Sequence, residues 1–370
     1  MTIFSFAIFR LVEHVSSLWE KNSDESKQQI DPERFTVVIP AYLPAEKNII
    51  INTINYFLSL DFPLEIVLVY NTPEDLPIET ELAQMPIRVI KVPNSSSKAE
   101  NLNYVLPQIE TEFTAIFDAD HQPVVNNFYQ ALYEFYQGYD IVQGTCLPLI
   151  DSPLSKFLSV ELNQMYNVNH YARQCLWGFA IFGGSNAYFR TELLQKLRFN
   201  NAALTEDIDL TLRAILCGSR IRFNRKIVSY ERAPGSLAEL WKQRSRWAQG
   251  WLQVSLRYNH ALIFGGQGHL SLRQKVGLFF LFPLREIGQL IILQPIPLAI
   301  ALSIQSHTWW VWTTPWLTLF AFTLSLLLSE PLWVFQVRGQ RSVSFAWFCL
   351  YAVLSPIYLL FLTNTVLHAY

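Results

Sequence analysis

An apolar run that ends in two carboxylates constrains the fold of this chain more than any other feature. Residues 113–117 (Phe-Thr-Ala-Ile-Phe) have the composition of a buried strand. Asp118-Ala119-Asp120 follows at once. Open α/β sheets bind ligands beyond the carboxyl ends of their strands, where an Asp-x-Asp pair can hold Mg²⁺ or Mn²⁺ through oxygen ligands. The alternative is an Asp-rich turn, because Asp readily occupies turns and caps.

Short β-branched and apolar runs alternate with helical stretches on both sides of this segment. The alternation predicts an α/β fold with βαβ units and a mostly parallel, Rossmann-like sheet in a domain over residues 35–251. Besides 113–117, the expected strands are 36–39, 65–70, 87–92, 140–145, 220–223 and 227–230. The expected helices are 46–60, 124–137 and 153–173, with further helices opening at Ser97, Thr205 and Leu237.

Two stretches near the C-terminus contain no Asp, Glu, Lys or Arg. They cover 287–329 and 342–370. At ~20 residues per membrane-spanning helix, their lengths predict a C-terminal α-helical transmembrane domain over 287–370, with spans near 287–304, 312–334 and 345–362. Buried soluble helices are the alternative, but the tryptophans at 309, 310, 312 and 316 favour membrane anchoring.

Two more segments are predicted to lie at the membrane surface. Residues 1–20 mix apolar residues with Arg10 and Glu13, which predicts an interfacial helix, with a signal anchor as the alternative. Residues 252–286 are expected to form an amphipathic interface segment.

The formal net charge of −2 argues against a nucleic-acid partner. The four cysteines form no zinc-binding pattern, which suits reduced thiols in the cytosol.

Two helix patterns carry chemistry later in the chain. Thr205 is a plausible N-cap for a helix whose first turn holds Glu206 and Asp207, and capping alone could explain these acids. Gln243, Arg246 and Trp247 share one helix face by their i, i+3, i+4 spacing. An Arg fork can bind phosphate and a neighbouring Trp can stack on a sugar, although arginines snorkelling at a membrane surface would give the same pattern.

Four motifs occur in the order found in a known enzyme family. They are Lys98 with Leu102-Asn103, Asp118-Ala119-Asp120, Thr205-Glu206-Asp207, and Gln243-x-x-Arg246-Trp247. From residue 36 to about 251, the chain resembles the membrane-embedded branch of the family 2 glycosyltransferases. That branch includes cellulose, chitin and hyaluronan synthases and several glycolipid synthases. Each motif is weak alone, but four in sequence are highly specific.

The resemblance implies a GT-A fold, a UDP-sugar donor and inversion at the anomeric carbon. It makes Asp207 the general base and Asp118 and Asp120 the ligands of Mg²⁺ or Mn²⁺. It places Lys98 and Arg246, with the Asp pair, at the nucleotide sugar. The donor and acceptor pocket would include Gly184, Ser185, Glu206, Gln243 and Trp247.

One position departs from the family pattern. Members usually carry an acid directly after the second strand, where it contacts the nucleotide base, but this chain has Tyr70-Asn71-Thr72-Pro73. The amide of Asn71 could hydrogen-bond a uracil instead.

The expected function is transfer of one sugar to a lipid or lipid-linked acceptor at the cytosolic face of a membrane, the inner membrane if the source is bacterial. The alternative is a processive β-glycan synthase, although processive relatives usually place two or more spans before the catalytic domain. A third reading is a non-catalytic scaffold on the same fold.

Overall fold

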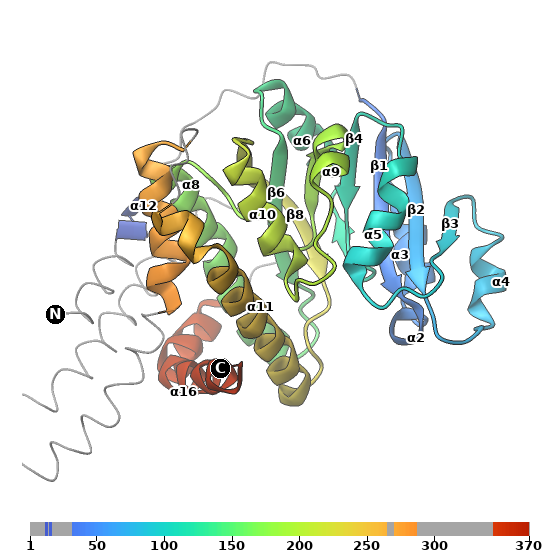
Figure 1. Ribbon diagram of the computed structural model, residues 1–370. Helices are drawn as coiled ribbons and strands as arrows, with labels where there is room; N and C mark the ends of the chain where they lie inside the picture. Colours follow the sequence, from blue (N-terminus) through green and yellow to red (C-terminus); the bar gives the residue numbers. More distant parts are fainter. Residues whose placement is uncertain (1–11, 14, 17–31, 265–269, 287–342, 370) are drawn as a thin grey trace, which may run out of the picture. The chain divides into compact units, whose positions relative to one another are not determined.

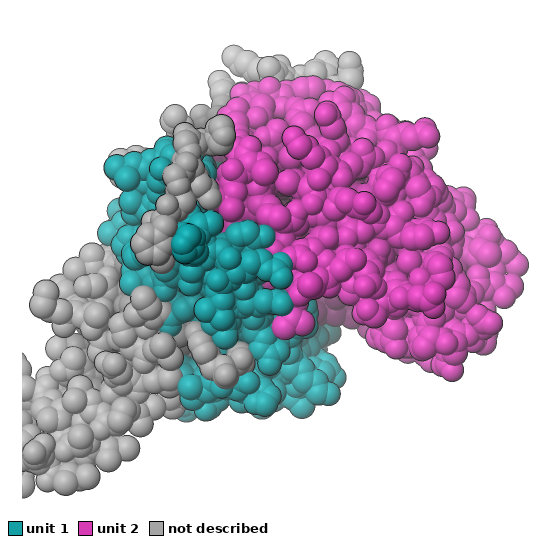
Figure 2. Space-filling view, in the orientation of Figure 1, with its two compact units in different colours: residues 1–21, 150–178, 233–370 teal, residues 22–149, 179–232 magenta. Residues whose placement is uncertain are grey.

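The computed structural model describes residues 12–13, 15–16, 32–264, 270–286 and 343–369 (Figure 1). Two compact units, each built from separate stretches of chain, are coloured teal and magenta in Figure 2. Unit 1 consists of Met1–Lys21, Ile150–Gly178 and Ala233–Tyr370, and unit 2 of Asn22–Leu149 and Phe179–Arg232. The predicted catalytic domain 35–251 therefore contributes residues to both units.

Unit 2 contains an eight-stranded sheet with the order β3-β2-β1-β4-β7-β6-β8-β5. The strands are β1 (Phe35–Tyr42), β2 (Leu64–Asn71), β3 (Arg88–Lys91), β4 (Phe113–Ile116), β5 (Gln122–Pro123), β6 (Ile141–Pro148), β7 (Ala187–Arg190) and β8 (Ile221–Glu231). Strands β3, β2, β1 and β4 run parallel to one another, and β6 runs parallel to β8. Strand β7 is antiparallel to both β4 and β6, and β5 is antiparallel to β8. The sheet is therefore mixed, and the predicted parallel part is its β3-β2-β1-β4 half.

Strand β1 lies at the centre of this parallel half. Val37 pairs with Ile66 of β2 on one side and with Ala115 of β4 on the other. All residues of β1 except Tyr42 are buried, as expected of a parallel strand covered on both faces. The carboxyl ends of β1, β2 and β4 consequently lie at the same edge of the sheet, where the Asp pair was predicted.

The helices of unit 2 are short and cover this sheet. They are α2 (Leu43–Glu46), α3 (Ile50–Leu58), α4 (Ile78–Leu82), α5 (Lys98–Val105), the 3-10 turn η2 (Leu106–Gln108), α6 (Asn126–Tyr136), α9 (Thr191–Leu197) and α10 (Glu206–Leu216). Aromatic rings fill much of the core. Phe35 alone contacts Phe113, Phe128 and Tyr188 with ring centroids 5.3–6.0 Å apart. This packing holds β1, β4, α6 and β7 together beneath the carboxyl edge.

All regular secondary structure that the structure describes in unit 1 is helical. Its helices are α7 (Pro153–Asn163), the π-helix η3 (Gln164–His170), α8 (Tyr171–Trp177), α11 (Leu237–Phe264), α12 (Leu272–Leu281) and α16 (Phe345–Ala369). Helix α16 packs against α7 and α11, and α12 packs against α8 and α11. Tyr351 of α16 and Val160 of α7 are buried against each other with Phe157 and Trp347 beside them.

Three predicted elements differ in detail. The two strands expected at 220–223 and 227–230 are one strand, β8, because pairing with β6 continues through a register shift between Gln143 and Thr145. The single helix expected over 153–173 contains the π-helical η3. The helix expected over 46–60 is divided into α2 and α3.

The predicted membrane spans 287–304 and 312–334, and most of the predicted helix 1–20, lie outside the described residues. The third predicted span, 345–362, falls within α16. Among the helices that the structure describes, none combines the length and the apolar character required to cross a membrane.

Candidate active site

Lys98 connects three of the predicted site segments within unit 2. It is the first residue of α5, whose N-cap Ser97 accepts a hydrogen bond from the Glu100 amide. The Lys98 ammonium forms an ion pair with Asp118 and donates to the carbonyl oxygen of Gly184 at 2.7 Å. Burial alone would lower the pKa of Lys98, but the carboxylates of Asp118 and Glu206 raise it above its ordinary value. Lys98 is therefore a permanent cation at the carboxyl edge of the sheet.

The loop 183–185 is fixed by its neighbours in unit 2. The Asp118 amide donates to the Ser185 hydroxyl at 3.0 Å. The side chain of Gln143 on β6 donates to the Ser185 carbonyl at 3.0 Å and accepts from the Gly183 amide at 3.0 Å. The predicted pocket residues Gly184 and Ser185 thus lie beside the Asp pair. Gln143, buried inside β6, is a supporting residue that the sequence pattern did not single out.

Asp207 approaches the same loop from the first turn of α10. Gly184 has a φ of +91°, and a Cβ atom placed on it would lie 3.1 Å from Oδ2 of Asp207. Glu206 lies 3.9 Å from the Lys98 ammonium. The fold therefore brings together residues from three separate motifs, Lys98, Asp118 and Asp207, with Gly184 of the loop 183–185.

Thr205 occupies the predicted N-cap position of α10 but does not cap the helix with its side chain. Its buried hydroxyl has no hydrogen-bond partner among the described residues. The acids at 206 and 207 nevertheless lie in the first turn, where the helix dipole favours negative charge.

Asp120 lies on the other side of the Asp-x-Asp loop, against the end of β8. Its Oδ2 accepts from the Arg232 amide at 2.9 Å. Burial is the main cause of its raised pKa, and the nearby charges of Glu231 and Asp118 act in the same direction. The pair Asp118 and Asp120 is therefore attached to α5 on one side and to β8 on the other.

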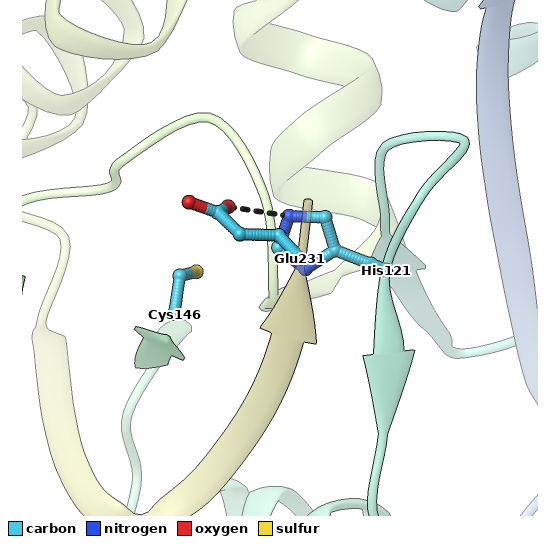
Figure 3. A group of neighbouring side chains, drawn as sticks. All are labelled: His121, Cys146 and Glu231. Carbon is cyan, nitrogen blue, oxygen red and sulfur yellow. Dashed lines mark ion pairs between the residues drawn. The ribbon is translucent and has the colours of Figure 1, made fainter. Parts of the chain in front are cut away.

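His121 and Glu231 form a buried pair behind this loop. The His121 Nε2 lies 2.9 Å from Oε2 of Glu231, and Nδ1 lies 3.0 Å from the Ser229 hydroxyl. Burial disfavours the charged imidazole, but Glu231 outweighs it and raises the pKa of His121. Figure 3 shows this pair with Cys146 beside it, the possible ligand atoms of the three lying within 4.8 Å of one another. Both imidazole nitrogens already have protein partners, so we assign the pair to holding the Asp loop against β8.

Glu46 is a third acid at this edge of the sheet, and the sequence analysis gave it no role. It ends α2, directly after β1, and its Oε2 accepts from the Tyr42 amide at 2.8 Å. Burial, followed by the charges of Asp118 and Asp120, raises its pKa to about 8. An acid following the central parallel strand was the available signal, because it must lie at the same edge as Asp118.

Asn71 ends β2 at the predicted position but uses its amide within the protein. It donates to the Ser95 carbonyl at 2.9 Å and accepts from the Asn101 amide at 2.8 Å. These bonds connect β2 to α5 and to the loop before it. Contact of Asn71 with a nucleotide base stays a prediction.

Gln243, Arg246 and Trp247 belong to unit 1, where all three lie on α11. Arg246 is exposed, while Gln243 and Trp247 are half-buried. An exposed guanidinium can bind an anionic ligand, and binding of a diphosphate by Arg246 stays a prediction.

The donor set in unit 2 suits a hard divalent cation. Asp118 and Asp120 offer carboxylate oxygens from one loop, and the ligands preferred by Mg²⁺ and Mn²⁺ are oxygens. Each carboxylate has one oxygen bound by Lys98 or by the Arg232 amide, and such bonds orient a ligand. The residues therefore fit the predicted ion.

A solved structure shares this fold. The chain aligns with a mannosyltransferase from Pyrobaculum calidifontis, PcManGT, in complex with GDP-Man and Mn²⁺, with a TM-score of 0.61 and 18% identity over 97% of this chain and 99% of that one. Together with the mixed sheet, this likeness identifies the GT-A fold.

The family is shown by its model. The glycosyl transferase family group 2 model matches residues 113–366, and the chain belongs to this family of glycosyltransferases. It is 25% identical over 255 residues to a probable glycosyltransferase, YdaM, of Bacillus subtilis, a match covering 65% of this chain and 59% of that protein. It is 23% identical over 220 residues to the poly-beta-1,6-N-acetyl-D-glucosamine synthase of Staphylococcus epidermidis, covering 57% and 53%. The chain thus spans little more than half the length of these relatives.

Proposed function

We propose that this chain is an inverting glycosyltransferase that moves a sugar from a UDP-linked donor to a hydroxyl of a lipid or lipid-linked acceptor. The observation that carries the proposal is the convergence of Lys98, Asp118 and Gly184 with Asp207, which brings an acid for proton transfer next to residues suited to a diphosphate. Family membership supports transfer from a nucleotide sugar.

Asp207 acts as the general base. The acceptor oxygen attacks the anomeric carbon from the face opposite the leaving group, and its proton passes to the Asp207 carboxylate. A new glycosidic C–O bond forms as the bond from the anomeric carbon to the diphosphate breaks, and UDP leaves. Gly184 permits this role because a side chain there would crowd the carboxylate.

The residues around Asp118 bind the donor. Lys98 supplies a fixed positive charge, and Asp118 and Asp120 supply oxygen ligands for Mg²⁺ or Mn²⁺. A divalent ion bound there would offset the negative charge that develops on the leaving diphosphate. The match to Gln-x-x-Arg-Trp assigns Arg246 to the diphosphate, which a planar guanidinium can bind, and assigns Gln243 and Trp247 to the donor or acceptor.

The acceptor is proposed to be a lipid because of the C-terminal sequence. Residues 287–329 carry no Asp, Glu, Lys or Arg over a length that suits about two spanning helices at ~20 residues each, which supports an integral membrane protein with its catalytic residues on the cytosolic side. Nucleotide sugars are made in the cytosol, and a lipid acceptor can reach an active site along the membrane plane.

A processive polysaccharide synthase is the second candidate. It is favoured by the likeness to the poly-beta-1,6-N-acetyl-D-glucosamine synthase of Staphylococcus epidermidis.

One experiment separates these functions. Membranes containing the full chain are incubated with labelled UDP-sugars and Mn²⁺, and the label is measured in organic extract and in insoluble polymer. We expect label in the organic extract, its loss in excess EDTA, and a 10²–10⁴-fold decrease for Asp207→Asn. UDP binding by that variant should stay within about twofold, because the base acts on the acceptor. Label in polymer would favour the second candidate, and activity of Asp207→Asn near the wild-type value would exclude Asp207 as the base.

A further inference from the structure

Arg244 is a buried cation within the Gln-x-x-Arg-Trp motif. It occupies the first x, a position for which the motif specifies no residue. Its side chain is 6% exposed, whereas Arg246, two residues later on α11, is exposed. Long cationic side chains are seldom buried this deeply unless they are paired. The contacts of Arg244 therefore indicate why its side chain is buried.

The guanidinium is anchored by two other helices of unit 1. Its Nη2 donates to Oε2 of Glu161 on α7 at 2.7 Å, and the Tyr358 hydroxyl of α16 donates to the same oxygen at 2.9 Å. Arg244, Glu161 and Tyr358 thus connect α11, α7 and α16 at one point. Such charge-assisted hydrogen bonds fix the direction of a planar fork.

The guanidinium lies over the ring of Trp247. Its central carbon is 4.1 Å from the ring centroid, and the i, i+3 spacing places both side chains on the same face of α11. Nε and Nη1 have no hydrogen-bond partner within the described part of the chain. The Trp247 ring face is a second contact of the guanidinium besides Glu161, and the cation–π attraction is strengthened where water is excluded.

We propose that Arg244, anchored by Glu161 and Tyr358, is a positioning residue that holds the Trp247 ring in the orientation used for binding the sugar. The inference rests on the proposed function, which gives Trp247 its place at the donor or acceptor. It also gives α16 a part in transfer, because Tyr358 on this C-terminal helix completes the anchor.

A purely structural ion pair is the competing explanation. Removing one partner of a buried pair destabilises a protein whatever the pair holds. The test therefore needs a signal from the Trp247 ring itself and a comparison of the change in kcat/KM with the change in UDP affinity.

The ring is followed by fluorine NMR of the full chain labelled with 5-fluorotryptophan, with Trp247→Phe assigning the resonance. Arg244→Met and Arg244→Lys remove the planar guanidinium, and Lys242→Met on the exposed side of α11 is the matched control. We expect the Trp247 resonance to move and broaden in both Arg244 variants and to stay unchanged in the control. Tyr358→Phe, which keeps the ion pair, should give a smaller change in the same direction.

Transfer is measured on the same proteins with the labelled UDP-sugar found active. We expect Arg244→Met to lower kcat/KM about tenfold, the size of losing one desolvated ring contact, with UDP affinity in Mn²⁺ within about twofold. Arg244→Met combined with Trp247→Phe should be no worse than Trp247→Phe alone, because both changes remove the same contact.

An unmoved Trp247 resonance in a folded Arg244 variant would overturn the proposal. If Arg244→Met does not fold, the Trp247 resonance is compared with that of the wild type in Tyr358→Phe and Glu161→Gln. An unmoved resonance in both would overturn the proposal. Absence of transfer in the unaltered protein would reject the proposed function, while the resonance would still show whether Arg244 holds the ring.

Discussion

At the scale of single residues, the carboxyl edge of the sheet in unit 2 concentrates negative charge around one lysine. Four acidic side chains lie in this region: Glu46, Asp118, Asp120 and Glu206. Lys98 forms ion pairs with Asp118 and Glu206. The raised pKa values of Glu46 and Asp120 are consequences of this crowding together with burial. A divalent cation would relieve the repulsion, which suits a site for a metal-bound diphosphate.

The close approach of Gly184 to Asp207 gives the first prediction. Gly184→Ala should lower stability by about 1 kcal/mol because an L-residue is strained at positive φ, and it should also displace Asp207. Gly218 is a matched control, since it has a φ of +84° with nothing within 4 Å of an added Cβ. Both variants should show similar losses in urea unfolding, but only Gly184→Ala should lose transfer activity. Equal activities would contradict the proposed place of Asp207.

Glu46 gives a pH dependence. Its folded pKa of about 8 lies above its ordinary value of 4.5, so the folded protein binds a proton that the unfolded chain releases between these values. The contribution of Glu46 to stability is therefore full below about pH 4.5 and is lost as the pH rises through 8. In metal-free protein, the stability of the wild type relative to Glu46→Gln should fall from pH 5 to pH 8, measured by urea unfolding at ~1-unit intervals. A constant difference would show that Glu46 is solvated.

At the scale of secondary structure, the start of α5 positions the central cation. Ser97 caps this helix through the Glu100 amide, and Lys98 is its first residue. The capping residue and the site lysine are thus adjacent in the chain. The cap that stabilises α5 therefore also positions the Lys98 side chain in the site.

Ser97→Ala should cost about 1 kcal/mol, the usual effect of losing an N-cap, and should weaken UDP binding through Lys98. Ser97→Asn keeps a capping oxygen and should behave as the wild type in both thermal unfolding and UDP titration. If Ser97→Ala loses stability without any change in UDP affinity, the orientation of Lys98 does not depend on the cap.

At the scale of the whole molecule, the chain alternates between the units, with three segments in unit 1 and two in unit 2. Unit 1 takes up residues 150–178 between two parts of unit 2, and its later helices include the Gln-x-x-Arg-Trp motif and α16. Helix α16 packs against α7 and α11, and its Tyr358 hydroxyl donates to Glu161 of α7 within unit 1.

The proposed membrane topology is tested by reporters fused after Tyr370. If 287–334 crosses the membrane twice from a cytosolic catalytic domain and α16 stays packed within unit 1, green fluorescent protein at that position should be fluorescent and alkaline phosphatase should be inactive. Arg338 and Arg341 would then lie on the cytosolic side, as the positive-inside rule expects. Active alkaline phosphatase at the C-terminus would instead indicate an odd number of crossings, such as the three spans predicted from the sequence.

The amino-acid sequence alone predicted the class of fold and singled out most residues of the candidate site, whose roles stay predictions. Strand periodicity located β1, β2 and β4, and residues that follow parallel strands must share one edge of the sheet, so Asp118 could be placed in advance. Lys98 and Asp207 were recognisable because their motifs are local in sequence.

Tertiary structure decided what depends on contacts between distant segments. Three features depend on contacts between residues that are 40 to more than 100 positions apart, which no local pattern encodes. They are the antiparallel β7, the continuous β8 and the contact of His121 with Glu231. Glu46 became part of the site through burial beside Asp118, and Arg244 became distinct from Arg246 only because α7 and α16 cover it. Burial and long-range pairing are properties of the folded chain. They show which residues support the candidate site, and a local sequence pattern does not.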